Sequence, residues 1–294
     1  MNGATPVLLD TDIGSDIDDA VALSYLLAER RCDLLGVSTV TGEAPKRAML
    51  ASAVCRAAGR RDIPVWSGAE KPLLLEQKQR GAPQAEVLPN WDHQEEFEPN
   101  RAVLQMRELI RSYSEKVVLL TVGPLTNVGL LFSIDPEIPR MLDRLVIMGG
   151  TYEPCGREWN VMGDPHAASI VFNADVPKVR VYGLDVTTQC KMSAEDCRDA
   201  FTGGPLDLVA EMADVWFRQR EQITFHDPLA ACCIFEPEIC SYRYGQVHVE
   251  YTDPERMGHS SLEQKEGGRH GVAMEVDTDE FFDRYFSTVD VFKK

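Results

Sequence analysis

The stretch that decides the fold runs from Val7 to Asp19 and reads Val7-Leu8-Leu9-Asp10-Thr11-Asp12-Ile13-Gly14-Ser15-Asp16-Ile17-Asp18-Asp19. Its apolar opening, Val7-Leu8-Leu9, is typical of a short buried strand. The residues that follow, Ala20-Val21-Ala22-Leu23-Ser24-Tyr25-Leu26-Leu27, predict a helix. The strand therefore leads through an acidic loop directly into a helix.

This loop carries five aspartates within ten residues, Asp10 to Asp19. Gathering so many carboxylates at the end of a strand costs repulsion and desolvation, and a bound cation offsets both. Hard cations such as calcium and magnesium take oxygen ligands of this kind. An acidic helix cap is the alternative interpretation, because acids in a first turn interact favourably with the helix dipole, but a cap needs only about one or two acids. The cluster therefore predicts a metal–carboxylate active site.

The composition is that of an ordinary globular protein with an acidic balance. The chain has 294 residues, 44% of them hydrophobic and 26% charged, and a formal net charge of −17. Such a charge argues against nucleic-acid binding, which usually needs a basic patch. No apolar run approaches the roughly 20 residues of a membrane-spanning helix, and no signal-peptide pattern opens the sequence. We therefore expect a cytoplasmic protein with no nucleic-acid or membrane partner.

Short apolar runs alternate with amphipathic stretches along the chain. We predict strands at 7–9, 34–38, 117–120, 144–148 and 179–182. Helical patterns lie between them, at about 17–29, 44–58, 99–113, 125–133 and 165–173. Strands that alternate with helices imply an α/β fold with a mostly parallel, Rossmann-like open sheet flanked by helices. We expect one domain over residues 1–294, with ligands bound at the carboxyl ends of the strands.

Parts of the chain do not follow this alternation. Residues 70–99 are rich in Gln, Glu and Pro, and we interpret them as a long loop or flap over a site, because long loops in compact domains are often functional. Residues 245–251 alternate like a strand, and residues 277–292 have the pattern of a closing helix. These last segments predict an additional C-terminal part.

Further segments at predicted strand ends or helix starts join the aspartates as candidates for one site. They are Thr121–Asn127 with its Gly-Pro turn, Met148–Gly150 followed by Glu158–Asn160, and His226-Asp227-Pro228. Each has a simpler explanation alone: Gly149-Gly150 is a turn, and Asp227 caps a helix that begins at Pro228. Their order and their places at strand ends favour a shared site.

Together these segments resemble the nucleoside hydrolase family, typified by the inosine–uridine preferring ribohydrolases. The resemblance runs from Val7 to Asp279, and the aspartate-rich opening is its most specific part. It implies the nucleoside hydrolase form of the α/β fold. It also implies calcium-dependent hydrolysis of the N-glycosidic bond of ribonucleosides, which gives ribose and free base in purine or pyrimidine salvage. The expected assembly is a homodimer or homotetramer.

The resemblance implies metal-binding and catalytic roles for individual residues. Asp12, Asp19, Asp227 and the carbonyl of Val122 would bind Ca²⁺. Asp12 would also be the base that takes a proton from a metal-activated water, which attacks the anomeric carbon. His226 would be the general acid for the departing base, since the unperturbed pKa of histidine lies closest to neutrality.

The resemblance likewise implies how the nucleoside is held. Asp18 would bind the ribose hydroxyls, with Met148 against the sugar. Glu158 and Asn160 would hold the 5′ side of the sugar. Glu43 stands where the family usually places an asparagine that contacts the substrate, so Glu43 is a further substrate-binding candidate. A carboxylate there changes the charge and the hydrogen bonding of the site.

Departures from the family pattern leave alternatives open. Ile13 replaces the family's proline, and additional residues precede Asp18-Asp19, so Asp16 is an alternative to Asp18 as the ribose ligand. The segment before Glu158 is short, and an asparagine that the family uses near the 5′-hydroxyl has no clear counterpart in it. The residues expected near the base, in 70–99 and around Trp216, do not distinguish purines from pyrimidines.

Other functions fit part of the sequence. Asp10-Thr11-Asp12 also resembles the start of magnesium-dependent haloacid-dehalogenase-type phosphatases, but that family requires neither Asp18-Asp19 nor a late His-Asp-Pro. A non-catalytic nucleoside- or ribose-binding protein of the same fold is the second alternative, motivated by Glu43 and the short segment before Glu158. The acids of the predicted site are nevertheless all present.

Overall fold

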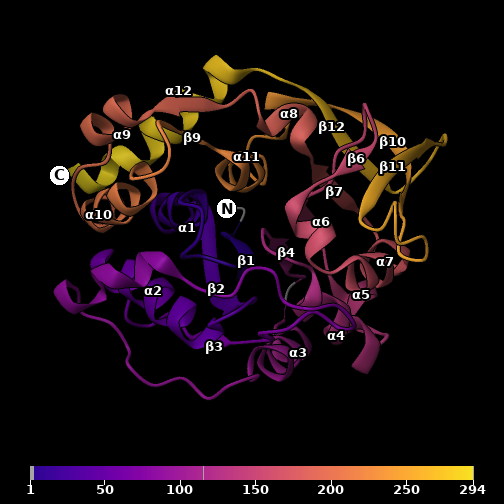
Figure 1. The fold of residues 1–294 in the computed structure, drawn as a ribbon, viewed down its shortest axis with the longest axis horizontal. Helices are drawn as coiled ribbons and strands as arrows, with labels where there is room; N and C mark the ends of the chain where they lie inside the picture. The colour runs from indigo at the N-terminus through magenta and orange to yellow at the C-terminus, as the bar shows by residue number, and fades with distance from the viewer. Residues whose placement is uncertain (1–2, 115, 294) are drawn as a thin grey trace.

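A ten-stranded sheet runs through the computed structural model, which describes residues 3–114 and 116–293 (Figure 1). The strand order is β3-β2-β1-β4-β5-β7-β12-β10-β11-β6. The bounds are β1 (Thr5–Thr11), β2 (Cys32–Thr39), β3 (Val65–Ser67), β4 (Val118–Thr121), β5 (Arg144–Met148), β6 (Gly156–Arg157), β7 (Val179–Tyr182), β10 (Cys240–Val249), β11 (His259–Gln264) and β12 (His270–Val276). A separate antiparallel pair consists of β8 (Lys191–Ser193) and β9 (Gln222–Thr224).

The direction of the strands fixes where a ligand can bind. All neighbours from β3 to β12 are parallel. β10, β11 and β6 continue the sheet in antiparallel fashion. The chain moves from β1 through β2 to β3 on one side, and from β4 through β5 to β7 on the other, so the order reverses between β1 and β4. In open α/β sheets such a switch point opens a crevice at the carboxyl ends of the strands.

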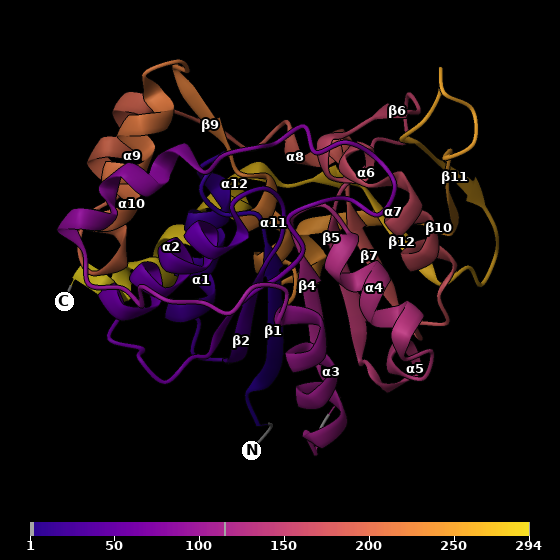
Figure 2. The same ribbon diagram turned by 60° about the horizontal axis from the view of Figure 1, so that its bottom comes forward.

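Helices cover both faces of this sheet. They are α1 (Asp18–Ala28), α2 (Ala44–Ala57), α3 (Ala102–Ser112), α4 (Thr126–Ile134), α5 (Ile138–Met141), α6 (Trp159–Gly163), α7 (Pro165–Asn173), α8 (Leu184–Thr187), α9 (Ala194–Ala200), α10 (Pro205–Phe217), α11 (His226–Cys232) and α12 (Thr278–Val289), with 3-10 turns η1 (Pro83–Asn90), η2 (Pro237–Ile239) and η3 (Asp290–Lys293). Figure 2 shows α1 and α2 on one side of the sheet and α3, α4 and α5 on the other. No helix among the described residues is long and apolar enough to cross a membrane.

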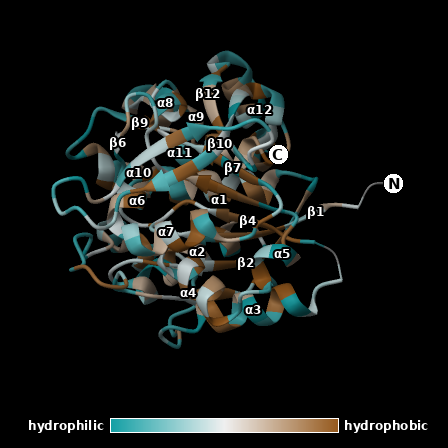
Figure 3. Ribbon diagram, turned by 90° about the vertical axis from the view of Figure 1, so that its right-hand side faces the viewer, coloured by the Kyte–Doolittle hydropathy of each residue, from teal (hydrophilic) through white to brown (hydrophobic). Residues whose placement is uncertain are grey.

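The central strands supply the middle of two hydrophobic cores, one on each face of the sheet. Successive strand residues point to opposite faces, so Val7 and Leu9 pack with α1, α2 and α11, whereas Leu8 packs with α3, α4 and α7. Figure 3 shows hydrophobic residues gathered on β1, β2 and β4. Strands buried on both faces must be continuously apolar, which is why they were recognisable from sequence.

The predicted fold class is confirmed, and each strand and helix predicted up to residue 182 is present. The strand predicted at 245–251 is the end of β10, and the closing helix is α12 followed by η3. The C-terminal part is not an appendage, because β12 and β10 lie within the central sheet. The segment 70–99 contains η1 and is not irregular throughout.

An aromatic cluster anchors the C-terminal helix beside the predicted site. The ring of Phe225, fully buried, lies 5.2 Å from that of Phe282, 5.5 Å from that of Tyr285 and 6.1 Å from that of Phe281, centroid to centroid. These partners all belong to α12, and Phe225 directly precedes α11. Aromatic pairs at these separations add to the stability gained by burying their surface.

We expect Phe225→Ala to lower the free energy of unfolding by about 3–5 kcal/mol, because it leaves a cavity among rings that cannot close over it. Urea denaturation measures the change. The control is Leu74→Ala, since Leu74 is 74% exposed and its loss should change stability by less than about 0.5 kcal/mol. Equal midpoints and slopes of the urea denaturation curves of the two variants would contradict the anchoring role of the aromatic cluster around Phe225.

Candidate active site

The loop after β1 and the turn after β4 meet at the switch point of the sheet. The backbone N–H of Val122 donates to the carbonyl of Asp10 at 2.9 Å, which extends the β1–β4 ladder to the site. Gly123 lies so close to the acidic loop that a Cβ there would be 2.8 Å from Oδ1 of Asp12. A glycine is therefore required where the carboxylate of Asp12 passes the turn.

A cavity of about 540 Å³ opens above this point. The residues predicted from sequence that line it are Asp12, Asp16, Asp18, Asp19, Val122, Met148, Glu158, Asn160, His226 and Asp227. Gln79 and Trp216 also line it, and they come from the two segments expected near the base. Lining residues to which no role was assigned are Ser15, Arg157, Trp159, Met162, Leu184 and Arg220. The structure thus brings together the acidic loop, the β4 turn, the segment after β5 and α11.

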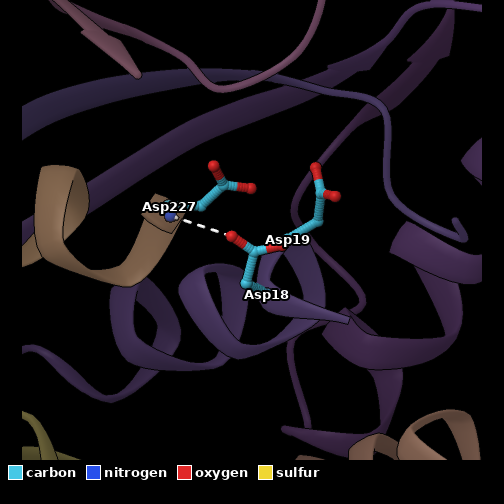
Figure 4. Close-up of side chains that lie close together, drawn as sticks. All are labelled: Asp18, Asp19 and Asp227. Carbon is cyan, nitrogen blue, oxygen red and sulfur yellow. Dashed lines mark hydrogen bonds between the residues drawn. The ribbon is translucent and has the colours of Figure 1, made fainter. Parts of the chain in front are cut away.

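Acidic side chains converge on one point of the cavity wall (Figure 4). Asp18 and Asp19 open α1, Asp227 lies in the first turn of α11, and one oxygen of each carboxylate lies within 4.8 Å of the others. The N–H of Asp227 donates to Oδ2 of Asp18 at 3.1 Å, and the Thr11 hydroxyl donates to Oδ1 of Asp19. Asp227 is not a helix cap as predicted, because α11 begins at His226 with Phe225 in the cap position.

The charge state of these acids reflects their confinement. Burial, followed by repulsion from neighbouring aspartates, raises the pKa of Asp18, Asp19 and Asp227 well above the ordinary value. Burial also raises the pKa of Asp12 to about 6, although the charge of Arg47 acts against it. Like charges held together in this way are stable only if protons or a cation compensate them. An all-oxygen donor set fits a hard divalent cation.

Asp12, Asp16 and Asp18, for which the sequence predicts roles as metal or ribose ligands, all line the same cavity. Asp18, predicted as a ribose ligand, belongs to the close group with Asp19 and Asp227, whereas Asp12, predicted as a metal ligand, lines the same cavity outside that group. Asp16 also faces the cavity, and its Oδ1 accepts a hydrogen bond from the N–H of Ile17 at 2.7 Å.

Another part of the cavity wall is built around a buried glutamate. Glu158 caps α6, and its carboxylate accepts hydrogen bonds from the N–H groups of Asn160 at 2.8 Å, Gly150 at 2.9 Å and Val161 at 3.1 Å. Its pKa is raised to about 6 because burial outweighs these bonds. Nδ2 of Asn160 donates to the carbonyl of Val122 at 2.7 Å, which couples this wall to the β4 turn.

The hydrogen bonds of His226 define its tautomer. The Thr187 hydroxyl donates its only proton to the carbonyl of Gly183 at 3.1 Å, so it accepts at 2.7 Å from Nδ1–H of His226. Burial, with the charge of Lys191, lowers the pKa of His226 to about 4. The neutral imidazole therefore carries its lone pair on Nε2, and protonation of Nε2 must precede any role as a general acid.

Glu43 does not line the cavity. It has left-handed backbone angles, φ 61° and ψ 37°, and it lines a different hollow together with Lys46 and Ala82. Its carboxylate accepts a hydrogen bond from the N–H of Ala82 at 3.0 Å and pairs with Lys46. The structure therefore gives no support to the predicted contact between Glu43 and a substrate.

Sequence analysis missed Arg47, which is fully buried in α2. Its guanidinium donates to the carbonyls of Asp12, Ile13, Gly42 and Gly81 and to the hydroxyl of Ser15. The bond to Gly42 is 2.9 Å and that to Gly81 is 2.9 Å. Arg47 thus joins the loops after β1 and β2 to residue 81. The available signal was its spacing from Leu50, Ala51 and Val54, which places it on the apolar face of the helix.

The fold and the cavity define an α/β protein with a buried acidic cluster that could hold a cation, and comparison with known proteins gives its family. Residues 7–283 match the profile of the inosine-uridine preferring nucleoside hydrolases. The pyrimidine-specific ribonucleoside hydrolase RihA of Citrobacter koseri is 34% identical over 271 residues, covering 84% of this chain and 84% of that protein. Uridine nucleosidase 1 of Arabidopsis thaliana is 28% identical over 284 residues, covering 88% of this chain and 82% of that protein.

A solved structure agrees in fold over almost the whole chain. The purine-preferring ribonucleoside hydrolase from Gardnerella vaginalis has a TM-score of 0.84 at 21% identity, covering 98% of this chain and 99% of that chain. The chain belongs to the inosine-uridine preferring nucleoside hydrolase family. It is thus a hydrolase of N-glycosyl compounds, as predicted.

We expect Arg47→Met to lower the free energy of unfolding by at least about 3 kcal/mol, because several buried carbonyls and carboxylates lose their cationic partner. The free energy of unfolding of Arg47→Lys should lie between those of the wild type and Arg47→Met, since lysine keeps the charge but not the planar set of donors. Urea denaturation compares them with Arg140→Met, which removes an exposed arginine paired with Asp175. Similar stability of Arg47→Met and Arg140→Met would contradict the role of Arg47.

Proposed function

We propose that the chain hydrolyses the N-glycosidic bond of ribonucleosides in a Ca²⁺-dependent reaction. The observation that carries this proposal is the convergence of the buried carboxylates of Asp18, Asp19 and Asp227 at the switch point, in a cavity that Glu158 and Asn160 also line. Membership of the nucleoside hydrolase family supports the bond that is cleaved.

Calcium suits the donor set. Asp18, Asp19 and Asp227 offer carboxylate oxygens, and Asp12 and the carbonyl of Val122 face the same cavity. Ca²⁺ takes six to eight oxygen ligands in flexible geometry, whereas Mg²⁺ demands a near-ideal octahedron. When bound, the cation supplies Lewis acidity that makes a coordinated water easier to deprotonate.

The side chains divide the chemistry between them. Asp12 accepts the proton of the attacking water, and the oxygen of that water bonds to C1′ as the C1′–N bond breaks. The electron pair of that bond leaves with the base, which acquires a proton. The sugar develops positive charge as in other glycoside hydrolysis, and the surrounding carboxylates stabilise it. Glu158 and Asn160 hold the 5′ side of the ribose, and Met148 packs against the ring.

The leaving base would lie toward the open side of the cavity. Trp159 and Trp216 line it there and offer flat apolar surfaces, with Gln79 and Arg220 as polar partners. His226 remains the candidate general acid, and Asp18, if it binds the cation and the ribose together, keeps the role predicted for it. Asp16 is the alternative ribose ligand.

Pyrimidine ribonucleosides are the first substrates to test, since relatives at 34% and 28% identity are named pyrimidine-specific ribonucleoside hydrolase and uridine nucleosidase. From the family resemblance we also infer a homodimer or homotetramer, a cytoplasmic location and a role in nucleoside salvage. The comparisons favour neither a haloacid-dehalogenase-type phosphatase nor a non-catalytic nucleoside-binding protein.

A panel of uridine, cytidine, inosine and adenosine tests the reaction. We expect reducing sugar to appear from at least one of them, loss of that activity with a calcium chelator, and recovery when Ca²⁺ is restored in excess. Release of phosphate from p-nitrophenyl phosphate with Mg²⁺, without sugar from any nucleoside, would refute the proposal. Unchanged turnover in the chelator would refute the metal dependence alone.

Variants of two acids test the division of roles. Asp12→Asn should lower kcat by about 10²–10⁴-fold, the range typical of a general base, because the amide cannot accept the proton. Asp227→Ala should weaken Ca²⁺ binding, measured by calorimetry, because it removes one converging carboxylate. Asp279→Asn, an exposed aspartate on α12, is the control. Wild-type kcat in Asp12→Asn, or wild-type Ca²⁺ affinity in Asp227→Ala, would contradict the assigned role.

A further inference from the structure

A second hollow of about 510 Å³ adjoins the active-site cavity. Arg157 and Met162 line both spaces. The rest of its wall comes from residues 75–78 and Arg80 of the 70–99 segment and from Pro254 and Met257. An extended ligand in the first cavity would therefore meet this second hollow across Arg157 and Met162.

The second hollow is basic, although the chain has a net charge of −17. Lys78, Arg80 and Arg157 line it, and Glu76 is the only acid in its lining. None of these cations forms an ion pair with an acidic side chain in the described part of the chain. By contrast, Arg218 pairs with Glu86 and Arg56 pairs with Asp92 elsewhere on the surface. Positive charge is thus in excess around the hollow, with the cations Lys78, Arg80 and Arg157 against the acid Glu76.

Arg157 is held in place without being neutralised. Its Nε donates to the carbonyl of Met257 at 2.9 Å, and its Nη2 donates to the carbonyl of Glu255. The turn that provides these carbonyls packs tightly on α6, since a Cβ at Gly258 would be 2.9 Å from Cα of Met162. A guanidinium has five donors in a fixed plane, so donors remain for a ligand anion, and such planes suit phosphate oxygens.

The hollow continues the wall that holds the sugar. Arg157 directly precedes Glu158, and Met162 lies on α6 with Asn160. In the proposed function, on which this inference rests, Glu158 and Asn160 hold the 5′ side of the ribose. A substituent on the 5′ oxygen would extend past Arg157 toward Lys78 and Arg80.

We propose that this basic hollow is a subsite for a 5′-phosphate, and that ribonucleoside 5′-monophosphates are substrates. Water adds its oxygen to C1′, the C1′–N bond breaks, and the base leaves with that electron pair and one proton from the water. The products are free base and ribose 5-phosphate, and the phosphate ester is not cleaved. With this hollow, the site accepts ribonucleosides with a 5′-phosphate as well as free ribonucleosides, and it can distinguish between the two at the 5′ position.

The test compares kcat/KM for uridine 5′-monophosphate with kcat/KM for uridine, at one free Ca²⁺ concentration. We expect the wild-type enzyme to hydrolyse both, and the double variant Lys78→Gln/Arg80→Gln to lower the nucleotide-to-nucleoside ratio about tenfold or more, as expected for lost charged contacts. The matched control, Lys178→Gln/Lys265→Gln, removes the same charge far from both hollows and should change the ratio less than about twofold. Inosine and its 5′-monophosphate repeat the comparison for a purine.

The outcomes separate this inference from the proposed function. Turnover of uridine or inosine without turnover of either nucleotide would overturn the subsite and leave the nucleoside reaction intact. An equal fall of the ratio in both double variants would also overturn it, because long-range charge would then explain the effect. If no nucleoside were hydrolysed, the proposed function would fail, and calorimetric binding of uridine 5′-monophosphate to the same variants would still decide whether the hollow binds phosphate.

Discussion

The mutual repulsion of buried carboxylates at the switch point is the constraint on which the rest of the site depends. Asp18 and Asp19 begin α1, where the helix dipole offsets part of their charge, and the N–H of Asp227 donates to Asp18. Arg47 adds a buried positive charge that acts on Asp12 and Asp19. Without a cation, the raised pKa of Asp12 makes folding progressively less favourable as pH rises from 3.8, with the full penalty above about 6. A cation replaces those protons and removes the penalty.

Much of this arrangement could be predicted from sequence, because buried parallel strands are continuously apolar and the acids stand at their ends. Asp12, Val122, Glu158 and Asp227 line one cavity as expected. In the region after β7, the short elements α8, β8, α9 and β9 escaped prediction because none of them is longer than seven residues. β12 also escaped, since its place between β7 and β10 is set by tertiary pairing. Arg47 was missed for a similar reason: a charged residue in a helix is usually solvated, and only the fold shows the carbonyls that surround it.

The 70–99 segment is joined through its middle to the acidic loop after β1 and is not a free flap. The carbonyl of Gly81 accepts from Arg47, and the N–H of Gln84 donates to the carbonyl of Gly14 at 3.1 Å. Nε2 of Gln84 also donates to the carbonyl of Ser15 at 3.3 Å. These hydrogen bonds of Gly81 and Gln84 anchor the segment. They also fix the position of the residues just before them, including Gln79, which lines the cavity. Glu43, for which the structure supports no substrate contact, belongs to the same anchor, because its carboxylate accepts a hydrogen bond from the N–H of Ala82.

The pairing of Asp18 with Asp227 spans 209 residues of chain. During synthesis the acidic loop emerges early, while its partner on α11 and the α12 rings that hold Phe225 emerge last. Contacts of such long sequence separation form late, after loop closure has been completed. A nascent chain with only the first half of the sheet would thus expose its carboxylates to water and bind the cation weakly. Tight cation binding would then report that the whole chain has been made and folded.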